Sequence, residues 1–261
     1  MATANMNTPI SAANESNRFH LFKYAAPNNF YSLAGRLIPW VTVLAALLTI
    51  VGVYIGFFVA PTDFQQGDAY RIIFLHVPAA WMSMFIYMVM AFWAAIGLAF
   101  NTRMSSMMAS ALAPTGAMFT FLALWTGALW GRPTWGAWWV WDARLTSELI
   151  LLFLYIGFMA LQASIDDVRR ADKAGALIAL VGVINVPIIY FSVQWWNTLH
   201  QGSSINMKSA PTMAKTMLLG MLIMALAFWA YTIAITLYRA RCIVLEREQQ
   251  SDWVKAAGEQ L

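Results

Sequence analysis

The residues of this chain that could do chemistry are mainly indole and imidazole side chains. Five of its 13 tryptophans fall within residues 130–142, namely Trp130, Trp135, Trp138, Trp139 and Trp141. Its three histidines are His20, His76 and His200. Imidazole nitrogens are common metal ligands, and indole rings offer broad apolar faces. This combination favours a binding site for a flat, apolar ligand with a metal at its centre.

Heme has these three properties. Its macrocycle is a broad π-surface, and its iron takes axial imidazole nitrogens. Its propionates suit the planar fork of an arginine. Arg132 and Arg144 flank the tryptophans, Asp142 lies between them, and Arg71 precedes His76. Cys242 is the only cysteine, so the C-x-x-C-H pattern of covalent c-type heme is absent. The sequence therefore favours non-covalent heme b.

Each of these residues also has an ordinary explanation. A single histidine near a membrane interface commonly forms hydrogen bonds, and tryptophan is enriched at that interface. Such a belt, however, places tryptophans singly at helix ends. Here they are interleaved with Gly131, Pro133 and Gly136, which suit turns. We therefore interpret the segment as a platform of indole faces, too broken for a regular spanning helix. A zinc site is disfavoured because it needs three or four ligands.

The elements that position these residues are membrane-spanning helices. The chain is 61% hydrophobic and 11% charged, whereas soluble domains are about half apolar and a quarter charged. A span needs about 20 apolar residues, and six stretches qualify: 40–60, 79–100, 109–130, 146–165, 174–194 and 216–238. The fold class predicted is an all-α integral membrane protein with six transmembrane helices and a Trp-rich loop between helices 3 and 4.

The chain divides into three parts on this basis. Residues 1–38 form a polar N-terminal arm, residues 39–238 form the six-span membrane domain with the Trp-rich segment at 130–145, and residues 239–261 form a tail. Eleven of the 16 Lys and Arg residues lie on the side of the termini, and five lie on the other side. The positive-inside rule then predicts that both termini are cytoplasmic and that the Trp-rich loop is periplasmic. His76 and His200 share that periplasmic face, whereas His20 does not.

The stretch "WGRPTWGAWWVWDARLTSELI" resembles the WWD signature of the membrane heme-handling proteins. Together with "FLHVPAAW", "LHQGSS" and the six-span pattern, it is similar to the cytochrome c maturation protein C family of bacterial inner membranes. The resemblance covers about residues 40–238. It implies that His76 and His200 are the axial ligands of heme and that Trp130, Trp135, Trp138, Trp139, Trp141 and Asp142 form the platform. Arg71, Arg132 and Arg144 are then candidates for contact with the propionates or the chaperone.

The resemblance also implies partners. A periplasmic heme chaperone takes up the heme covalently, and a complex with an ATPase subunit, a second membrane subunit and a small helper peptide releases it. This sequence has no nucleotide-binding P-loop, so ATP use would belong to a partner. Membrane lipid is a further partner, and no nucleic acid is expected. We predict that the chain is not an enzyme, because no nucleophile–base pair stands out in the outer loops.

Two other classes of function stay open. A b-type cytochrome subunit would need histidines inside the spans to carry electrons across the membrane. A transporter or permease would need polar groups along a pathway, and few are present: Asn185 beside Pro187, and Glu148 near the start of span four. A larger heme-handling relative with a second heme is disfavoured, because only His20 is left to ligate it.

Overall fold

The computed structural model describes residues 25–196 and 212–258, and the regular structure of this part is helical. Its long helices are α1 (Pro27–Tyr54), α2 (Ile73–Phe100), α3 (Arg103–Trp135), α4 (Ala143–Ala163), α5 (Val168–Gly182), α6 (Asn185–Trp195) and α7 (Lys215–Arg247). Short elements complete it: a π-helical turn η2 (Ile55–Val59), a 3-10 helix η3 (Asp68–Ile72) and α8 (Asp252–Gly258).

Six helical stretches are long and apolar enough to cross a membrane, which confirms the six-span prediction. They are Pro27–Val59, Asp68–Phe100, Arg103–Trp135, Ala143–Ala163, Val168–Trp195 and Lys215–Arg247. Several are longer than their apolar stretches. The first begins at Pro27, because proline suits the first turn of a helix. Residues 27–38 of the predicted polar arm are thus helical.

The fifth span is broken between α5 and α6. Pro187 lies in the first turn of α6 and cannot donate the backbone hydrogen bond that would continue α5. The break before Pro187 is what a proline inside a span is expected to cause. Helix α3, by contrast, continues through Pro114 as one helix.

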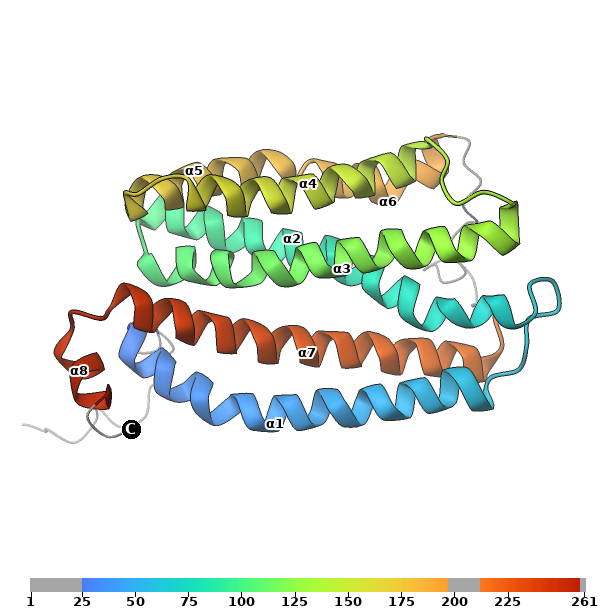
Figure 1. Ribbon diagram of the computed structural model, residues 1–261, viewed down its shortest axis with the longest axis horizontal. Helices are drawn as coiled ribbons and strands as arrows, with labels where there is room; N and C mark the ends of the chain where they lie inside the picture. The colour runs from blue at the N-terminus through green and yellow to red at the C-terminus, as the bar shows by residue number, and fades with distance from the viewer. Residues whose placement is uncertain (1–24, 197–211, 259–261) are drawn as a thin grey trace, which may run out of the picture.

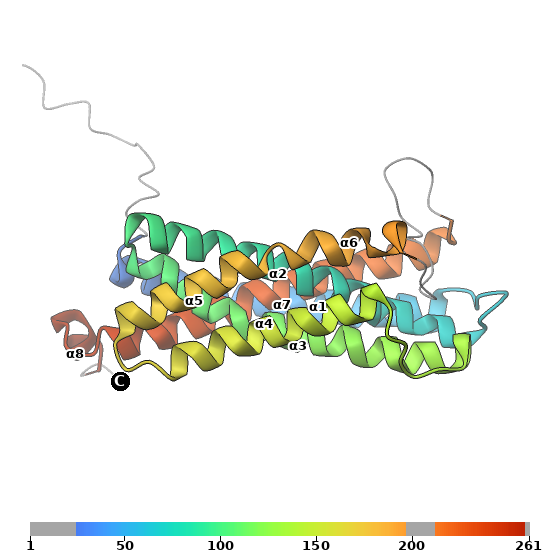
Figure 2. The same cartoon turned by 90° about the horizontal axis from the view of Figure 1, so that it is seen from above.

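The spans form two packed groups. Helix α2 packs most extensively on α3, and α1 on α7, while α4, α5 and α6 cover the outer side of α2 and α3 (Figure 1). Figure 2 shows the same long bundle from above. The connections before η3 and after α3, the end of α6 and the start of α7 lie at one end of the bundle, as the loop assignment predicted. The start of α1 and helix α8 lie at the opposite end.

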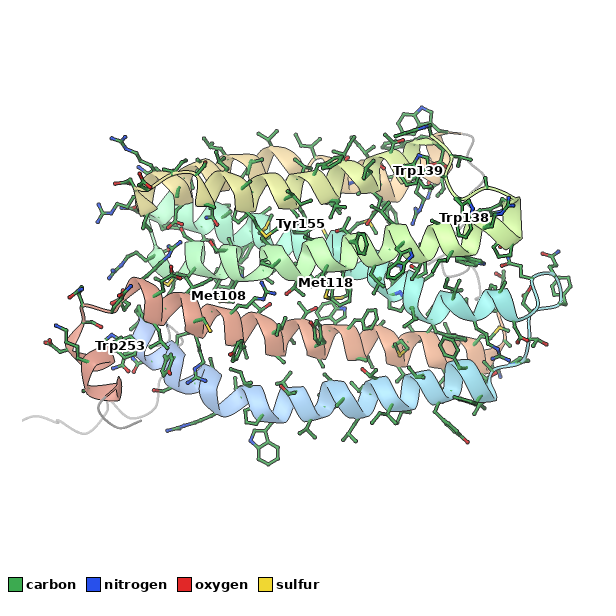
Figure 3. The ribbon with its side chains drawn as sticks, viewed as in Figure 1. Met108, Met118, Trp138, Trp139, Tyr155 and Trp253 are labelled. Carbon is green, nitrogen blue, oxygen red and sulfur yellow. The ribbon has the colours of Figure 1, made fainter. Side chains whose placement is uncertain are left out.

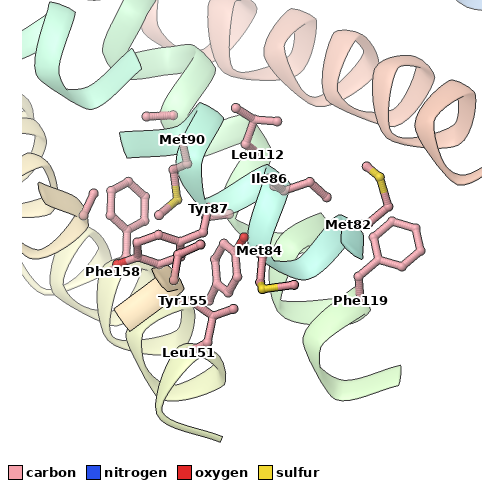
Figure 4. Packing of buried hydrophobic residues seen from close by; sticks show 14 of the residues in the cluster. Met82, Met84, Ile86, Tyr87, Met90, Leu112, Phe119, Leu151, Tyr155 and Phe158 are labelled. Carbon is pink, nitrogen blue, oxygen red and sulfur yellow. The ribbon is translucent and has the colours of Figure 1, made fainter. Parts of the chain in front are cut away.

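The core of the larger group is built around two tyrosines. Tyr87 of α2 and Tyr155 of α4 are fully buried, and their rings meet edge to face with centroids 4.9 Å apart (Figure 4). The Tyr155 hydroxyl donates to the carbonyl of Ser83, 2.8 Å away. Gly116 of α3 faces Tyr155 so closely that a Cβ atom there would overlap the ring. The absence of a side chain at Gly116 therefore sets the distance between α3 and α4.

Charged and aromatic contacts tie the elements together at the end that carries the termini. Arg247 forms a two-pronged ion pair with Asp172, at 2.8 and 2.9 Å, which joins the end of α7 to α5. Trp253 of α8 packs on Tyr31 of α1, with ring centroids 5.7 Å apart. The described part of the predicted tail therefore folds against the bundle.

Candidate functional site

A cavity opens at the end of the bundle opposite the termini, between α2, α3, the connection at residues 136–142 and α4. Its empty space of about 720 Å³ includes the open solvent at its mouth. Most of its lining is apolar. The lining residues that could recognise a ligand are His76, Trp130, Trp135, Trp138, Trp139, Asp142, Arg144 and Glu148.

His76 reaches this cavity from the first turn of α2, where only 8% of its surface is exposed. Its Nδ1 lies 3.0 Å from Oγ1 of Thr126 on α3. The Thr126 hydroxyl has one proton, and its oxygen lies 2.6 Å from the carbonyl of Leu122. The hydroxyl therefore donates to Leu122 and accepts from Nδ1–H of His76. A bond of this kind orients a metal-ligating histidine through the nitrogen that does not bind the metal.

The space around the imidazole depends on Gly127. A Cβ atom at this position would lie 3.0 Å from Cε1 of His76, a distance that would force the ring to move. On the other side, the ring of Trp130 meets His76 edge to face, with centroids 5.6 Å apart. Thr126, Gly127 and Trp130 thus form a frame on α3 that holds the imidazole in one orientation.

The Trp-rich segment is partly helical, which corrects the prediction of a loop over its whole length. Helix α3 continues through Pro133 to Trp135, and Gly136 ends it with φ of 77°. This left-handed conformation is easily adopted only by glycine and is common just after a helix. Pro133 has no N–H to donate to the carbonyl of Leu129, so the last turn of α3 has one backbone hydrogen bond fewer. Trp130 is consequently a buried helical residue, 3% exposed, whose Nε1 donates to Oε1 of Gln66 at 2.7 Å.

The other tryptophans differ in their surroundings. Trp135, Trp138 and Trp139 line the cavity, and Figure 3 labels the last two near the connection between α3 and α4. Trp141 does not line it and is largely exposed. The Nε1 donor of Trp139 is buried and has no hydrogen-bond partner in the described part of the chain. The cavity wall therefore contains an indole N–H that a ligand oxygen could accept.

Asp142 and Arg144 make different contacts at the start of α4. Asp142 is the N-cap of α4, and its carboxylate accepts the backbone N–H of Leu145 at 2.8 Å. Arg144 lies in the first turn, where a cation is unfavourable for the helix dipole. Its Nη1 donates to the carbonyl of Ile189 on α6 over a long 3.4 Å. A guanidinium has five N–H donors, so Arg144 has further donors for an anion in the cavity.

A buried carboxyl forms part of the inner wall. Glu148 lies one helical turn after Arg144, and its Oε1 lies 2.7 Å from Oγ of Ser83 on α2. The same Ser83 hydroxyl lies 2.8 Å from the carbonyl of Ala80. Glu148 was noted in the sequence as a polar residue within a span, but its position on the cavity wall depends on how α2 and α4 pack.

Two predicted cations, Arg71 and Arg132, are not in the cavity wall. Arg71 donates to the carbonyls of Gly56 and Ala60 at 2.9 and 3.0 Å, and thus fixes the end of the first span. Arg132 bonds to the carbonyl of Gly136 at the end of α3. Their contacts with propionates or a chaperone stay predictions. His200 lies outside the described residues, as does His20, so the pairing of His200 with His76 also stays a prediction.

Thr126 and Gly127 were not singled out from the sequence, although their spacing contains a signal. Residues three or four positions apart share a face of a helix, and both lie at this spacing before Trp130. Both lie within the predicted span 109–130, where the sequence does not show which face of the helix meets His76.

Replacing Thr126 with valine is expected to lower the heme retained by the purified protein about 10- to 100-fold, because the imidazole loses its orienting bond. Heme content per protein and the Soret spectrum would measure this. Thr120→Val is the matched control, since the Thr120 hydroxyl bonds within α3 to the carbonyl of Gly116. Equal heme retention in the two variants would show that the Thr126 bond does not orient a ligand.

The cavity meets the requirements of a heme in three respects. Its walls are mainly apolar and aromatic, which suits a macrocycle. An oriented imidazole on the wall can supply an axial ligand. The guanidinium of Arg144 and the unpartnered indole N–H of Trp139 can serve carboxylate oxygens. The side chains of the cavity therefore fit a heme, the ligand that the tryptophans and histidines of the sequence indicated.

Comparison with known proteins gives one consistent family. Residues 20–255 match the family model of heme exporter protein C. The chain is 47% identical over 234 residues to heme exporter protein C of Escherichia coli (strain K12), covering 90% of this chain and 94% of that protein. It is 43% identical over 241 residues to the Haemophilus influenzae protein of the same name, covering 92% and 98%. The match to the Bradyrhizobium diazoefficiens protein is 45% over 231 residues, covering 88% of each. With a six-span helical fold and a match over most of its length, the chain belongs to the heme exporter protein C family.

Proposed function

We propose that this protein binds heme at the periplasmic face of the bacterial inner membrane and delivers it to a periplasmic heme chaperone for c-type cytochrome biogenesis. The observation that carries the proposal is the Trp-lined cavity, in which His76 and Arg144 face one apolar space. The names of the relatives, heme exporter protein C, support a role in heme export. The heme is cargo and is held without a covalent bond.

In this proposal, different residues of the cavity contact the iron, the macrocycle and the propionates of the heme. His76 supplies an axial nitrogen, and Thr126 keeps its ring in place. Trp135, Trp138 and Trp139 cover the macrocycle, while Arg144 and the indole N–H of Trp139 pair with carboxylates. The second axial ligand in this proposal is His200. Exposed Trp141 and the half-exposed Trp138 then form a surface against which the chaperone docks.

The export complex around this chain is part of the same proposal. An ATPase subunit, a second membrane subunit and a small helper peptide would release the loaded chaperone, since this sequence lacks a P-loop. The chain itself handles heme and does not act as an enzyme.

The direct test is purification of the full chain from heme-replete cells, with and without a coexpressed periplasmic heme chaperone. We expect a low-spin heme spectrum in the protein alone and heme attached to the chaperone when both are present. A purified, folded chain without heme under both conditions would contradict the proposal.

Arg144→Lys is expected to weaken heme retention or chaperone loading while the protein level stays normal. Lysine keeps the positive charge but loses the planar fork that matches a carboxylate. The alternative role of Arg144 is contact with lipid phosphate, which lysine preserves, so a fully active variant would favour that role. Arg103→Lys is the control, because Arg103 begins α3 at the opposite end of the bundle and forms an ion pair with Glu248.

The orientation of the chain can be tested with reporter fusions after residues 65, 137 and 205. All three are expected to be active only as periplasmic reporters, because of the excess of basic residues on the side of the termini. Cytoplasmic activity of the fusion at residue 137 would place the Trp-lined cavity on the wrong side for delivery to a periplasmic chaperone.

A further inference from the structure

A second hollow lies within the membrane-spanning region, on the side of the bundle that carries the termini. It is a crevice between α2, α3 and α7 with about 560 Å³ of empty space. Its walls are apolar stripes, with Phe85, Val89 and Trp93 on α2 and Met108 and Leu112 on α3. Figure 3 labels Met108 where α3 faces α7. The crevice separates α7 from the hairpin of α2 and α3, and it shares none of its lining with the His76 cavity.

The crevice opens toward the bilayer. Its floor is buried, whereas Trp229 and Ile233 at its rim are 41% and 47% exposed. Both residues lie within the span Lys215–Arg247, so their exposed surfaces face lipid. At the deeper end, the rings of Phe85 and Trp229 lie 4.2 Å apart and close the crevice. An occupant therefore enters sideways from the membrane.

One hydroxyl in the crevice is unsatisfied. Thr236 lines it and is only 4% exposed, and its Oγ1 has no hydrogen-bond partner in the described residues. Threonines in the spans normally bond to the carbonyl four residues earlier. In this bundle Thr49, Thr120, Thr126 and Thr232 all do so, at 2.6 to 2.8 Å. Thr236 thus lacks the hydroxyl-to-carbonyl hydrogen bond that these four threonines make. An unpaired buried hydroxyl lowers the stability of a protein.

The missing partner must be an acceptor that is carried by an apolar molecule. A water molecule needs two to four polar partners, and the other hydroxyl of the crevice, that of Thr232, is bonded to the carbonyl of Phe228. A helix from another protein could also present a carbonyl, as α2 presents that of Ser83 to Tyr155, but a helix is about 10 Å across, so a single acyl chain enters a crevice between packed helices more readily. A phospholipid supplies both: its ester carbonyl is a hydrogen-bond acceptor, and the acyl chain attached to it is apolar.

The depth of Thr236 agrees with this occupant. Arg239 lies three residues further along α7, which is on the same face and about 4.5 Å nearer the end of the helix. A cation at that level can contact a lipid phosphate, and ester carbonyls lie just below the phosphates. From Thr236 to Trp229 the crevice continues for about 10 Å toward the membrane centre, which is enough for much of an acyl chain.

We propose that the crevice between α2, α3 and α7 is a binding site for one diacyl phospholipid of the leaflet on the side of the termini, with Thr236 donating to an ester carbonyl and the acyl chain lying against Trp93, Phe85 and Trp229. This site is independent of heme binding.

The test compares two phospholipids that differ only in the proposed acceptor. The purified full-length protein is equilibrated in detergent with equal amounts of a diester phosphatidylglycerol and its diether analogue of the same chains. It is then washed until about one lipid per protein remains, and the retained lipids are counted by mass spectrometry. The wild type is expected to retain the diester form about fivefold over the diether form, which corresponds to a hydrogen bond of about 1 kcal/mol.

Thr236→Val is expected to bring this ratio close to one, because valine keeps the shape of threonine without the hydroxyl. Thr232→Val is the matched control from the same crevice and is expected to keep the fivefold ratio. Equal retention of the two lipids by the wild type would overturn the proposal, as would equal losses in the two variants. Displacement of the diester lipid by a ubiquinone, from the wild type but not from Thr236→Val, would instead assign the site to a quinone.

Discussion

Replacing His76 with glycine is expected to remove most of the heme from the purified protein, and added imidazole is expected to restore part of it. The cavity has this single imidazole among its described lining residues, so no neighbouring side chain of the same type can take over. Glycine leaves space for free imidazole at the position of the ring, because Gly127 adds no side chain on that side. Heme content per protein and the low-spin spectrum, with and without imidazole, measure the effect.

Two further variants give this experiment its controls. His200→Gly is expected to change the spectrum in the same way if it supplies the second axial ligand, whereas His20→Gly is expected to leave heme content unchanged. An unaltered low-spin spectrum in both the His76 and His200 variants would show that the iron is ligated elsewhere. A loss of heme in the His20 variant would contradict the assignment of all heme contacts to the other side of the membrane.

Replacing Gly116 with alanine is expected to lower the free energy of unfolding by about 3 kcal/mol. The added Cβ would overlap the Tyr155 ring, which is fully buried and bonded to the carbonyl of Ser83. The ring cannot move without breaking that bond and its packing on Tyr87. The cost exceeds the gain in helix propensity of about 1 kcal/mol that alanine brings over glycine. In detergent the apparent melting temperature should fall by about 10 °C.

Gly157→Ala is the matched control for this prediction. Gly157 also lies within a span, but its added Cβ would meet only the flexible end of Ile178, at 3.2 Å. We expect a change of less than about 3 °C in this variant. If the Gly116 and Gly157 variants have the same apparent melting temperature, the spacing of α3 and α4 does not depend on the glycine at position 116.

Composition and periodicity determined the overall class of this protein. Six apolar stretches predicted six spans because a bilayer admits few ways to satisfy backbone polar groups, and helices are the simplest. The cap that Asp142 provides to the N–H of Leu145 is likewise local, since such caps depend only on neighbours in the chain. The Trp-rich segment and His76 indicated the kind of ligand, because their residue types alone limit the chemistry.

The boundary of α3 shows where local patterns were not enough. Gly131 and Pro133 suggested a loop, yet the helix continues to Trp135 because packing of Trp130 against Tyr70 and His76 outweighs the cost of a proline in the last turn. Tertiary contacts of this kind cannot be inferred from the propensity of a short segment.

The contacts that orient the side chains of the cavity were decided only by the tertiary structure. His76 and Thr126 are 50 residues apart, and Ser83 and Glu148 are 65 residues apart. Helical spacing predicts which residues share a face, but not which two faces meet or at what height along their axes. Those depend on how closely the helices approach, which is set by small residues such as Gly116 and Gly127 that have no pattern of their own. The sequence alone therefore determined the membrane fold and the chemical class of the ligand. Packing between distant helices decided the orientation of the imidazole, the lining of the cavity and the crevice beside α7.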